Sequence, residues 1–142
     1  MLLYFSELDR EATSQYTFFV NATDGCPYLA RTRTVRVDIT ILDSNDHRPV
    51  FSQCYYRFAL SQGVAASQYV GTVVATDADI GFNGQITYQL LDSSEYLQLD
   101  ATTDQIMTKK QLDGQSLGQN VLRIVATDGG SPSKNSTGKM QN

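Results

Sequence analysis

The chain has 142 residues, a length that suits one domain or parts of two. Its net charge of −4 at pH 7 argues against the basic face that nucleic-acid binding requires and against an anionic membrane surface. No apolar run approaches the roughly 18 residues of a membrane-spanning helix, so we expect no direct membrane insertion by this chain. The composition favours a soluble chain, or a piece of a longer protein, that attracts cations.

The N-terminal part of the chain predicts β-strands. Residues 2–5 are apolar and could end a strand. Residues 16–24 and 34–42 alternate between apolar and polar side chains, as half-buried strands do. These segments are expected to be the closing strands of an incomplete β-module.

Residues 43–51, with the sequence DSNDHRPVF, suit neither a strand nor a helix. Asn and Asp compete with a β-ladder through local hydrogen bonds, and the residue before Pro49 is disfavoured in a helix. Asp43, Asn45 and Asp46 instead supply hard oxygen ligands of the kind that Ca²⁺ prefers. The segment therefore predicts a calcium-stiffened joint between two β-modules.

The rest of the chain predicts short strands only. Tyr56, Phe58 and Leu60 alternate as a half-buried strand should, and no segment has a sustained helical period. Further strands are predicted at 69–76, 85–91, 96–99, 105–108 and 120–127. No clear strand follows the last of these.

The chain repeats itself at an offset of 104 residues. Leu8-Asp9 recurs as Leu112-Asp113, and the Ala-Thr-Asp-Gly block at 22–25 recurs at 126–129 without a gap. A repeat of this length is too long for a solenoid but matches a sandwich module of roughly 100 residues. The predicted fold is all-β, with seven-strand Greek-key (immunoglobulin-like) β-sandwich modules in tandem.

The first and last modules are expected to be incomplete. Residues 1–46 would be the C-terminal part of an upstream module, and residues 47–142 a second module lacking a clear last strand. Unpaired strand edges favour self-association, so we expect this chain to aggregate and a longer piece with whole modules to be monomeric. Equal monodispersity by light scattering would contradict that.

Acidic residues outside the joint fall at strand ends. Two pairs have a spacing of two residues, so in an extended backbone both side chains of a pair point the same way. If all meet at the joint, seven carboxylates converge, and neighbouring pairs repel by about 4 kcal/mol at ~4 Å and an effective dielectric of about 20. About three Ca²⁺ ions would nearly balance this charge. The seven are Asp9, Glu11, Asp43, Asp46, Asp77, Asp79 and Asp128.

The motifs resemble the calcium-binding signatures of the cadherin repeat. They read LDRE at 8–11, ATDG at 22–25, DSND followed by Pro49 and Phe51, and DADIGFNGQITY at 77–88. The resemblance covers nearly the whole chain and suggests the protocadherin or Fat/Dachsous-like kind. It implies a non-enzymatic, calcium-binding extracellular segment of a cell–cell adhesion protein, part of a larger single-pass protein of the plasma membrane.

The resemblance also implies partners and a ligand set. The partners would be calcium and other cadherin ectodomains, homophilic or heterophilic. Side-chain oxygens would come from the seven acidic residues and Asn45, and backbone carbonyls from Ser44, His47 and Asn83. The His47 ring would be solvated.

Two glutamines depart from the family pattern. Gln62 stands where the family has a glutamate ligand, and Gln115 stands where the upstream copy has Glu11. An amide offers an oxygen but no charge, so the joint after residue 142 should bind calcium weakly and bend. Equal affinities at both joints, measured by calorimetry, would contradict this hypothesis.

Of three other interpretations, the sequence argues against two and leaves one open. An EF-hand fails, because twelve-residue loops counted from Asp43 and Asp77 end at Cys54 and Tyr88 instead of a glutamate. GQSLG at 114–118 matches a hydrolase elbow, but a strand follows it and the only histidine lies upstream. A calcium-dependent structural or signalling spacer with no direct adhesive contact stays open beside the adhesion role.

Cysteines and sequons complete the sequence features. Cys26 and Cys54 are expected at opposite ends of a module, about 40 Å apart and beyond disulfide reach. Asn21-Ala22-Thr23 and Asn135-Ser136-Thr137 are N-glycosylation sequons, which are compatible with a secreted context.

Overall fold

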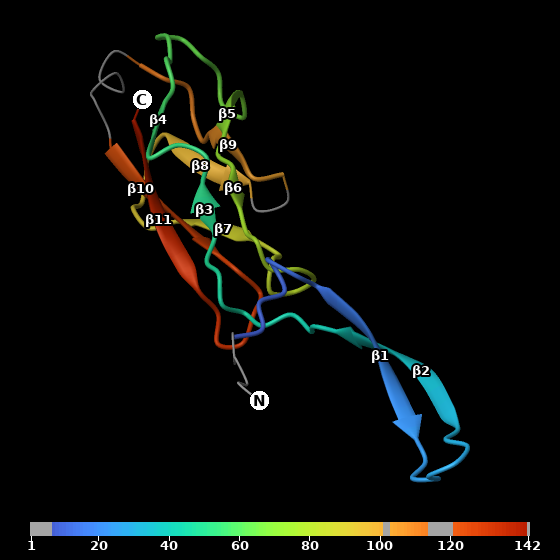
Figure 1. Cartoon of the computed structure of the whole chain (residues 1–142). Helices are drawn as coiled ribbons and strands as arrows, with labels where there is room; N and C mark the ends of the chain where they lie inside the picture. Colours follow the sequence, from blue (N-terminus) through green and yellow to red (C-terminus); the bar gives the residue numbers. More distant parts are fainter. Residues whose placement is uncertain (1–6, 101–102, 114–120, 142) are drawn as a thin grey trace. The chain divides into compact units, whose positions relative to one another are not determined.

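The computed structural model describes residues 7–100, 103–113 and 121–141. The chain divides into two compact units, Met1–Asp43 and Ser44–Asn142. Strands are the regular elements of both units, in line with the all-β prediction (Figure 1). The strand expected at residues 2–5 and the GQSLG motif lie outside the described residues. Among the described residues, no helix has the length and apolar character that crossing a membrane requires.

The first unit is a long antiparallel hairpin of β1 (Gln15–Thr23) and β2 (Thr32–Thr40). Both strands fall within two residues of the predicted segments. Phe18 pairs with Val37 in the register. Large apolar side chains remain exposed along both strands, Phe18 at 44% and Val35 at 60%. The hairpin therefore has apolar surface that the described residues leave uncovered.

The second unit is a β-sandwich (Figure 1). Its larger sheet has the order β4-β11-β10-β7, and the facing sheet has the order β5-β9-β8, with β3 paired to β6. Counting β3 with β4, and β5 with β6, as interrupted strands gives the seven strands of the predicted sandwich. The elements are β3 (Val50–Phe51), β4 (Tyr55–Arg57), β5 (Tyr69–Thr72), β6 (Ala75–Thr76), β7 (Thr87–Leu90), β8 (Leu97–Asp100), β9 (Gln105–Thr108), β10 (Val121–Thr127) and β11 (Asn135–Gln141).

The core lies between the two sheets. Side chains that point inward from both sheets are almost fully buried, and each large aliphatic one contributes about 1.5–3 kcal/mol of hydrophobic stabilisation. The buried cluster consists of Tyr56, Val73, Leu97, Ile106, Leu122, Ile124 and Met140. The predicted alternation of Tyr56, Phe58 and Leu60 is confirmed, since Tyr56 is buried and the other two pack against the cluster.

Two strand predictions were wrong. The segment 69–76 is not one strand, because β5 pairs with β9 whereas β6 pairs with β3. A last strand does exist: β11 pairs with β10 over seven residues and buries Gly138 and Met140. Its Asn-Ser-Thr-Gly-Lys sequence has weak β-propensity, so tertiary pairing decides its conformation.

Candidate metal site

The second unit begins at Ser44, and two buried carboxylates lie at the end of the sandwich where this first segment enters. We call this end the pole. Asp79 is 5% exposed and Asp128 is 4% exposed. Burying a charge costs several kcal/mol unless hydrogen bonds or an opposite charge compensate. The surroundings of these two side chains therefore show what the pole can bind.

Asp79 lies against the joint segment. The His47 backbone N–H donates to Asp79 Oδ2 at 3.2 Å, and His47 Nδ1 lies 3.1 Å from Asp79 Oδ1 and 2.8 Å from Asp46 Oδ1. One ligand atom from each of these three residues falls within 4.8 Å of the others. The hydrogen bond to Asp79 raises the pKa of His47; contact with Asp46 adds to the rise and desolvation opposes it. The His47 side chain is still 45% exposed, as the predicted solvated ring requires, although Nδ1 also contacts these two carboxylates.

Asp128 holds the other side of the pole. Its carboxylate accepts backbone N–H groups from Gly130 and Lys134, both at 3.0 Å. Asn45 Nδ2 donates to Asp128 Oδ1 at 3.3 Å and to the carbonyl of Pro132 at 2.7 Å. The amide nitrogen of Asn45 is thus fixed, which leaves its oxygen free for another partner.

Glycine is required where the backbone passes Asn45. A Cβ atom on Gly130 would lie 2.2 Å from Asn45 Nδ2, so a larger residue there would displace the amide. Gly84 similarly lets the turn at 80–84 approach Asp79, because a Cβ on it would lie 2.2 Å from the Asp79 carbonyl oxygen. These close approaches hold Asn45 and Asp79 in place.

Two buried oxygens at this pole have no hydrogen-bond partner among the described residues. They are Asn45 Oδ1 and Asp77 Oδ2; the other Asp77 oxygen accepts the Asp79 backbone N–H at 3.0 Å. A buried acceptor without a partner costs about 1–3 kcal/mol, and more when it is charged. A hard cation bound at either oxygen would satisfy it, and carboxylate and amide oxygens are the ligands of Ca²⁺. The donor set therefore fits a calcium ion.

Three further predicted ligands belong to the first unit. Asp9 Oδ1 accepts the backbone N–H groups of Glu11 and Ala12 at 2.9 and 3.2 Å, which caps a turn at residues 10–12. The expectation of an extended backbone at Asp9 and Glu11 was therefore wrong. Arg10 forms ion pairs with both Glu11 and Asp43, so its guanidinium neutralises carboxylates that the sequence assigned to a metal.

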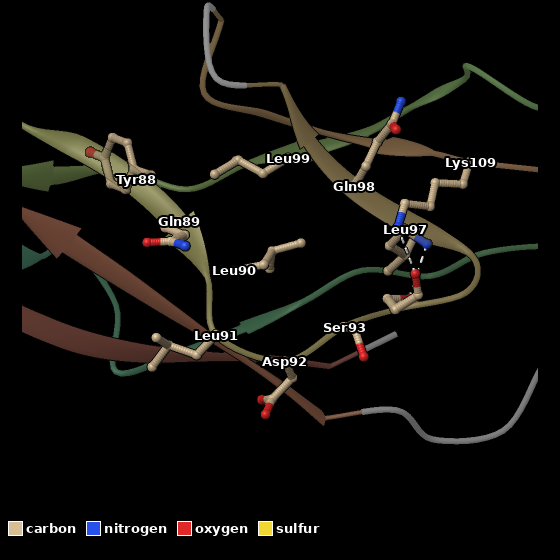
Figure 2. A pocket seen from close by; sticks show the side chains of 11 residues that line it. Tyr88, Gln89, Leu90, Leu91, Asp92, Ser93, Leu97, Gln98, Leu99 and Lys109 are labelled. Carbon is tan, nitrogen blue, oxygen red and sulfur yellow. Dashed lines mark hydrogen bonds between the residues drawn. The ribbon is translucent and has the colours of Figure 1, made fainter.

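A separate hollow of about 440 Å³ opens between β7 and β8. Figure 2 shows Leu90, Leu97 and Leu99 around it, with charged groups at the rim. Asp92 is engaged by a hydrogen bond from Arg123, which lowers the pKa of that carboxyl to about 2, and Lys109 Nζ donates to the Ser94 carbonyl at 2.9 Å. The hollow lies on strands and loops that carry none of the predicted metal ligands.

Cys26 and Cys54 are both exposed and form no disulfide.

The fold and the oxygen-rich pole define a class, a β-sandwich module with carboxylate and amide oxygens gathered at one end. The chain belongs to the cadherin family, because the pattern described as Cadherin domain matches residues 56–141. It is 35% identical over 134 residues to mouse cadherin EGF LAG seven-pass G-type receptor 1, with 94% of this chain and 4% of the relative covered. It is also 35% identical over 140 residues to human protocadherin-18, with 93% of this chain and 12% of that relative covered.

Solved structures show the same fold. The EC22–24 segment of mouse cadherin-23 aligns with a TM-score of 0.83 at 33% identity, covering 96% of this chain and 44% of that one. EC1–3 of the mouse clustered protocadherin PcdhgC3 aligns with a TM-score of 0.86 at 30% identity, covering 96% of this chain and 45% of that one. The chain spans 4% to 14% of the length of the curated relatives it matches. It is therefore similar to extracellular cadherin repeats of cell-adhesion proteins, the protocadherins among them.

Proposed function

We propose that the chain is a calcium-binding extracellular segment of a cell–cell adhesion protein, in which Ca²⁺ stiffens the joint between two repeats. One observation carries the proposal: two buried oxygens, Asn45 Oδ1 and Asp77 Oδ2, have no partner among the described residues. They accompany the buried carboxylates of Asp79 and Asp128. Membership of the cadherin family supports the assignment.

The ligands of this proposal come from both units, with about three ions bound between them. Carboxylates and the Asn45 amide supply most of the oxygens, and three backbone carbonyls complete the set. Residues 1–46 would then close one repeat and its linker, and residues 47–142 would form the next. The proposed ligands are Asp9, Glu11, Asp43, Ser44, Asn45, Asp46, His47, Asp77, Asp79, Asn83 and Asp128.

Different groups of the chain have different roles in the proposed calcium binding. Backbone N–H groups of Gly130 and Lys134 orient the Asp128 carboxylate, and hydrogen bonds fix the Asn45 amide so that its oxygen is presented. Calcium, when bound, supplies positive charge that offsets the repulsion among the carboxylates. Without that charge the carboxylates repel one another, and the joint is expected to bend.

The test is a calcium titration by calorimetry, combined with small-angle scattering in calcium and in chelator. We expect calcium uptake and a more extended, more rigid particle when calcium is present. Asp46→Ala should weaken both effects. Unchanged calcium uptake and unchanged rigidity in that variant would refute the proposal.

A second function, a calcium-dependent structural or signalling spacer, is supported by the small share of its relatives that the chain spans. In proteins of that length, adhesive contacts with other cadherin ectodomains could be made by other repeats. Beads coated with the chain distinguish the two functions: an adhesive segment clumps beads in calcium, whereas a spacer stiffens without clumping them.

A further inference from the structure

The first half of β11 has an open edge. One side of β11 pairs with β10 along its whole length, from Asn135 opposite Thr127 to Gln141 opposite Val121. On the other side, β4 pairs only with the residues from Lys139 onward. The preceding strand β3 pairs with β6 instead. The segment 135–138 therefore forms no ladder on that side among the described residues, although β3 passes close to it.

An open strand edge next to apolar surface is a site for unwanted pairing with another chain. A hollow of about 320 Å³ lies along this edge, with Phe51, Cys54 and Thr137 in its lining. The neighbouring Val50 is exposed. The hollow lies between this edge and the segment 48–54, so the edge borders an apolar surface.

A sequon lies on this edge. In Asn135-Ser136-Thr137 the alternation of the strand exposes Asn135 and Thr137, while the Ser136 hydroxyl oxygen is buried. Gly138 and Met140 take the inward positions of the same strand. The folded sandwich thus leaves space at the Asn135 amide for an attached oligosaccharide.

We propose that Asn135 carries an N-linked oligosaccharide and that this glycan covers the open edge of β11. The inference depends on the proposed extracellular location, because the modification occurs in the secretory pathway. A lipid-diphosphate-linked oligosaccharide is the donor. The bond between the Asn135 amide nitrogen and the anomeric carbon forms, the bond from that carbon to the diphosphate oxygen breaks, and the amide proton and the lipid diphosphate leave.

The second sequon provides a contrast within the chain. Asn21 lies in the interior of the β1–β2 ladder, opposite Thr34, and its side-chain oxygen accepts a hydrogen bond from the Thr34 hydroxyl at 2.7 Å. Asn21 belongs to the first unit, whereas β11 belongs to the second. Asn21→Gln is therefore the matched control for effects of glycan loss in general.

The experiment uses the full chain, secreted from animal cells behind a signal peptide. Enzymatic removal of N-glycans in heavy-oxygen water converts a glycosylated asparagine to labelled aspartate, which peptide mass spectrometry locates. We expect the label at Asn135, its loss in Asn135→Gln and in Thr137→Val, and its retention in Ser136→Ala, which leaves the sequon intact. Absence of the label from Asn135 in secreted wild-type chain overturns the inference.

Self-association tests the covering role. By analytical ultracentrifugation, Asn135→Gln should show more oligomer than Ser136→Ala and more than Asn21→Gln at the same concentration. Equal oligomer content in the three variants would overturn the covering role. Calcium binding is measured on the same secreted chains. A chain that binds calcium but carries no glycan at Asn135 refutes the glycan proposal and leaves the proposed calcium-binding function intact.

Discussion

Asp77→Asn should lower the stability of the second unit in calcium but not in chelator. Asp77 Oδ1 accepts the Asp79 backbone N–H at 3.0 Å, and an asparagine retains that acceptor. Asp77 Oδ2 is buried without a hydrogen-bond partner, and the substitution replaces this charged oxygen with an amide nitrogen. The substitution therefore removes a proposed metal ligand while preserving the local fold.

The expected change in the free energy of unfolding can be worked out separately for the calcium-free and the calcium-bound chain. In chelator, the buried unpartnered oxygen costs about 1–3 kcal/mol, so its removal should leave stability unchanged or raise it by up to that amount. In calcium at about 100 times the dissociation constant, binding stabilises the wild-type chain by about 2.7 kcal/mol. A tenfold weaker site in the variant would lose about 1.4 kcal/mol of this. A 1 kcal/mol change shifts the melting temperature of a domain of up to about 100 residues by roughly 4–8 °C.

Thermal unfolding followed by circular dichroism, in calcium and in chelator, measures both states. Asp92→Asn is the matched control, because the Asp92 carboxylate pairs with Arg123 near the start of β10, whereas the proposed ligand Asp128 follows the end of that strand. That control should lower stability equally in the two conditions. If Asp77→Asn destabilised the chain equally in calcium and in chelator, the Asp77 carboxylate would be a structural group, and its place in the ligand set would be wrong.

Three further outcomes are expected. Gly130→Ala should displace the Asn45 amide and weaken calcium affinity in calorimetry while the circular dichroism spectrum stays unchanged; unchanged affinity would contradict the role of Asn45. Met140→Ala should destabilise the second unit by about 2–5 kcal/mol in urea unfolding, equally with and without calcium, and a smaller loss would show that β11 does not complete the core. The folded-state pKa of Asp92 is lowered to about 2 by Arg123, so its contribution is present above the unfolded pKa of about 3.9 and is lost as the pH falls towards 2. Acid unfolding in that pH range should therefore be steeper for wild type than for Asp92→Asn, and identical profiles would contradict this.

Most strands could be predicted because their pattern is local. Alternation in β1, β2, β9 and β10 gave bounds within about two residues, since each presents one apolar face to a core or hairpin partner. The break between β5 and β6 could not be predicted in the same way. It depends on which strand lies alongside, β9 for the first piece and β3 for the second. Strand β11 was missed for a related reason, because its own residues have weak β-propensity and β10 supplies the pairing.

The candidate site shows the same limit on prediction. Oxygen-rich sequence at the joint indicated which residues could bind a hard cation, and the internal repeat indicated Asp9 and Asp128. The sequence could not show that a turn capped by Asp9 replaces the expected extended segment, because that turn depends on backbone hydrogen bonds. Nor could it show which side of the Asn45 amide is already engaged. These contacts join residues that are far apart in the sequence or depend on side-chain rotamers.

The charges of the second unit explain why its pole should depend on a metal. Asp46 and Asp79 have ligand atoms within 4.8 Å, and two unit charges at that separation repel by about 3.5 kcal/mol at an effective dielectric of about 20. The real repulsion is smaller, because the Asp46 side chain is 59% exposed. His47 supplies at most one positive charge when protonated, against four carboxylates in this unit's proposed ligand set. Hydrogen bonds orient Asp128 and Asp79 but add no net charge, so divalent cations are the partners that can offset the remaining negative charge.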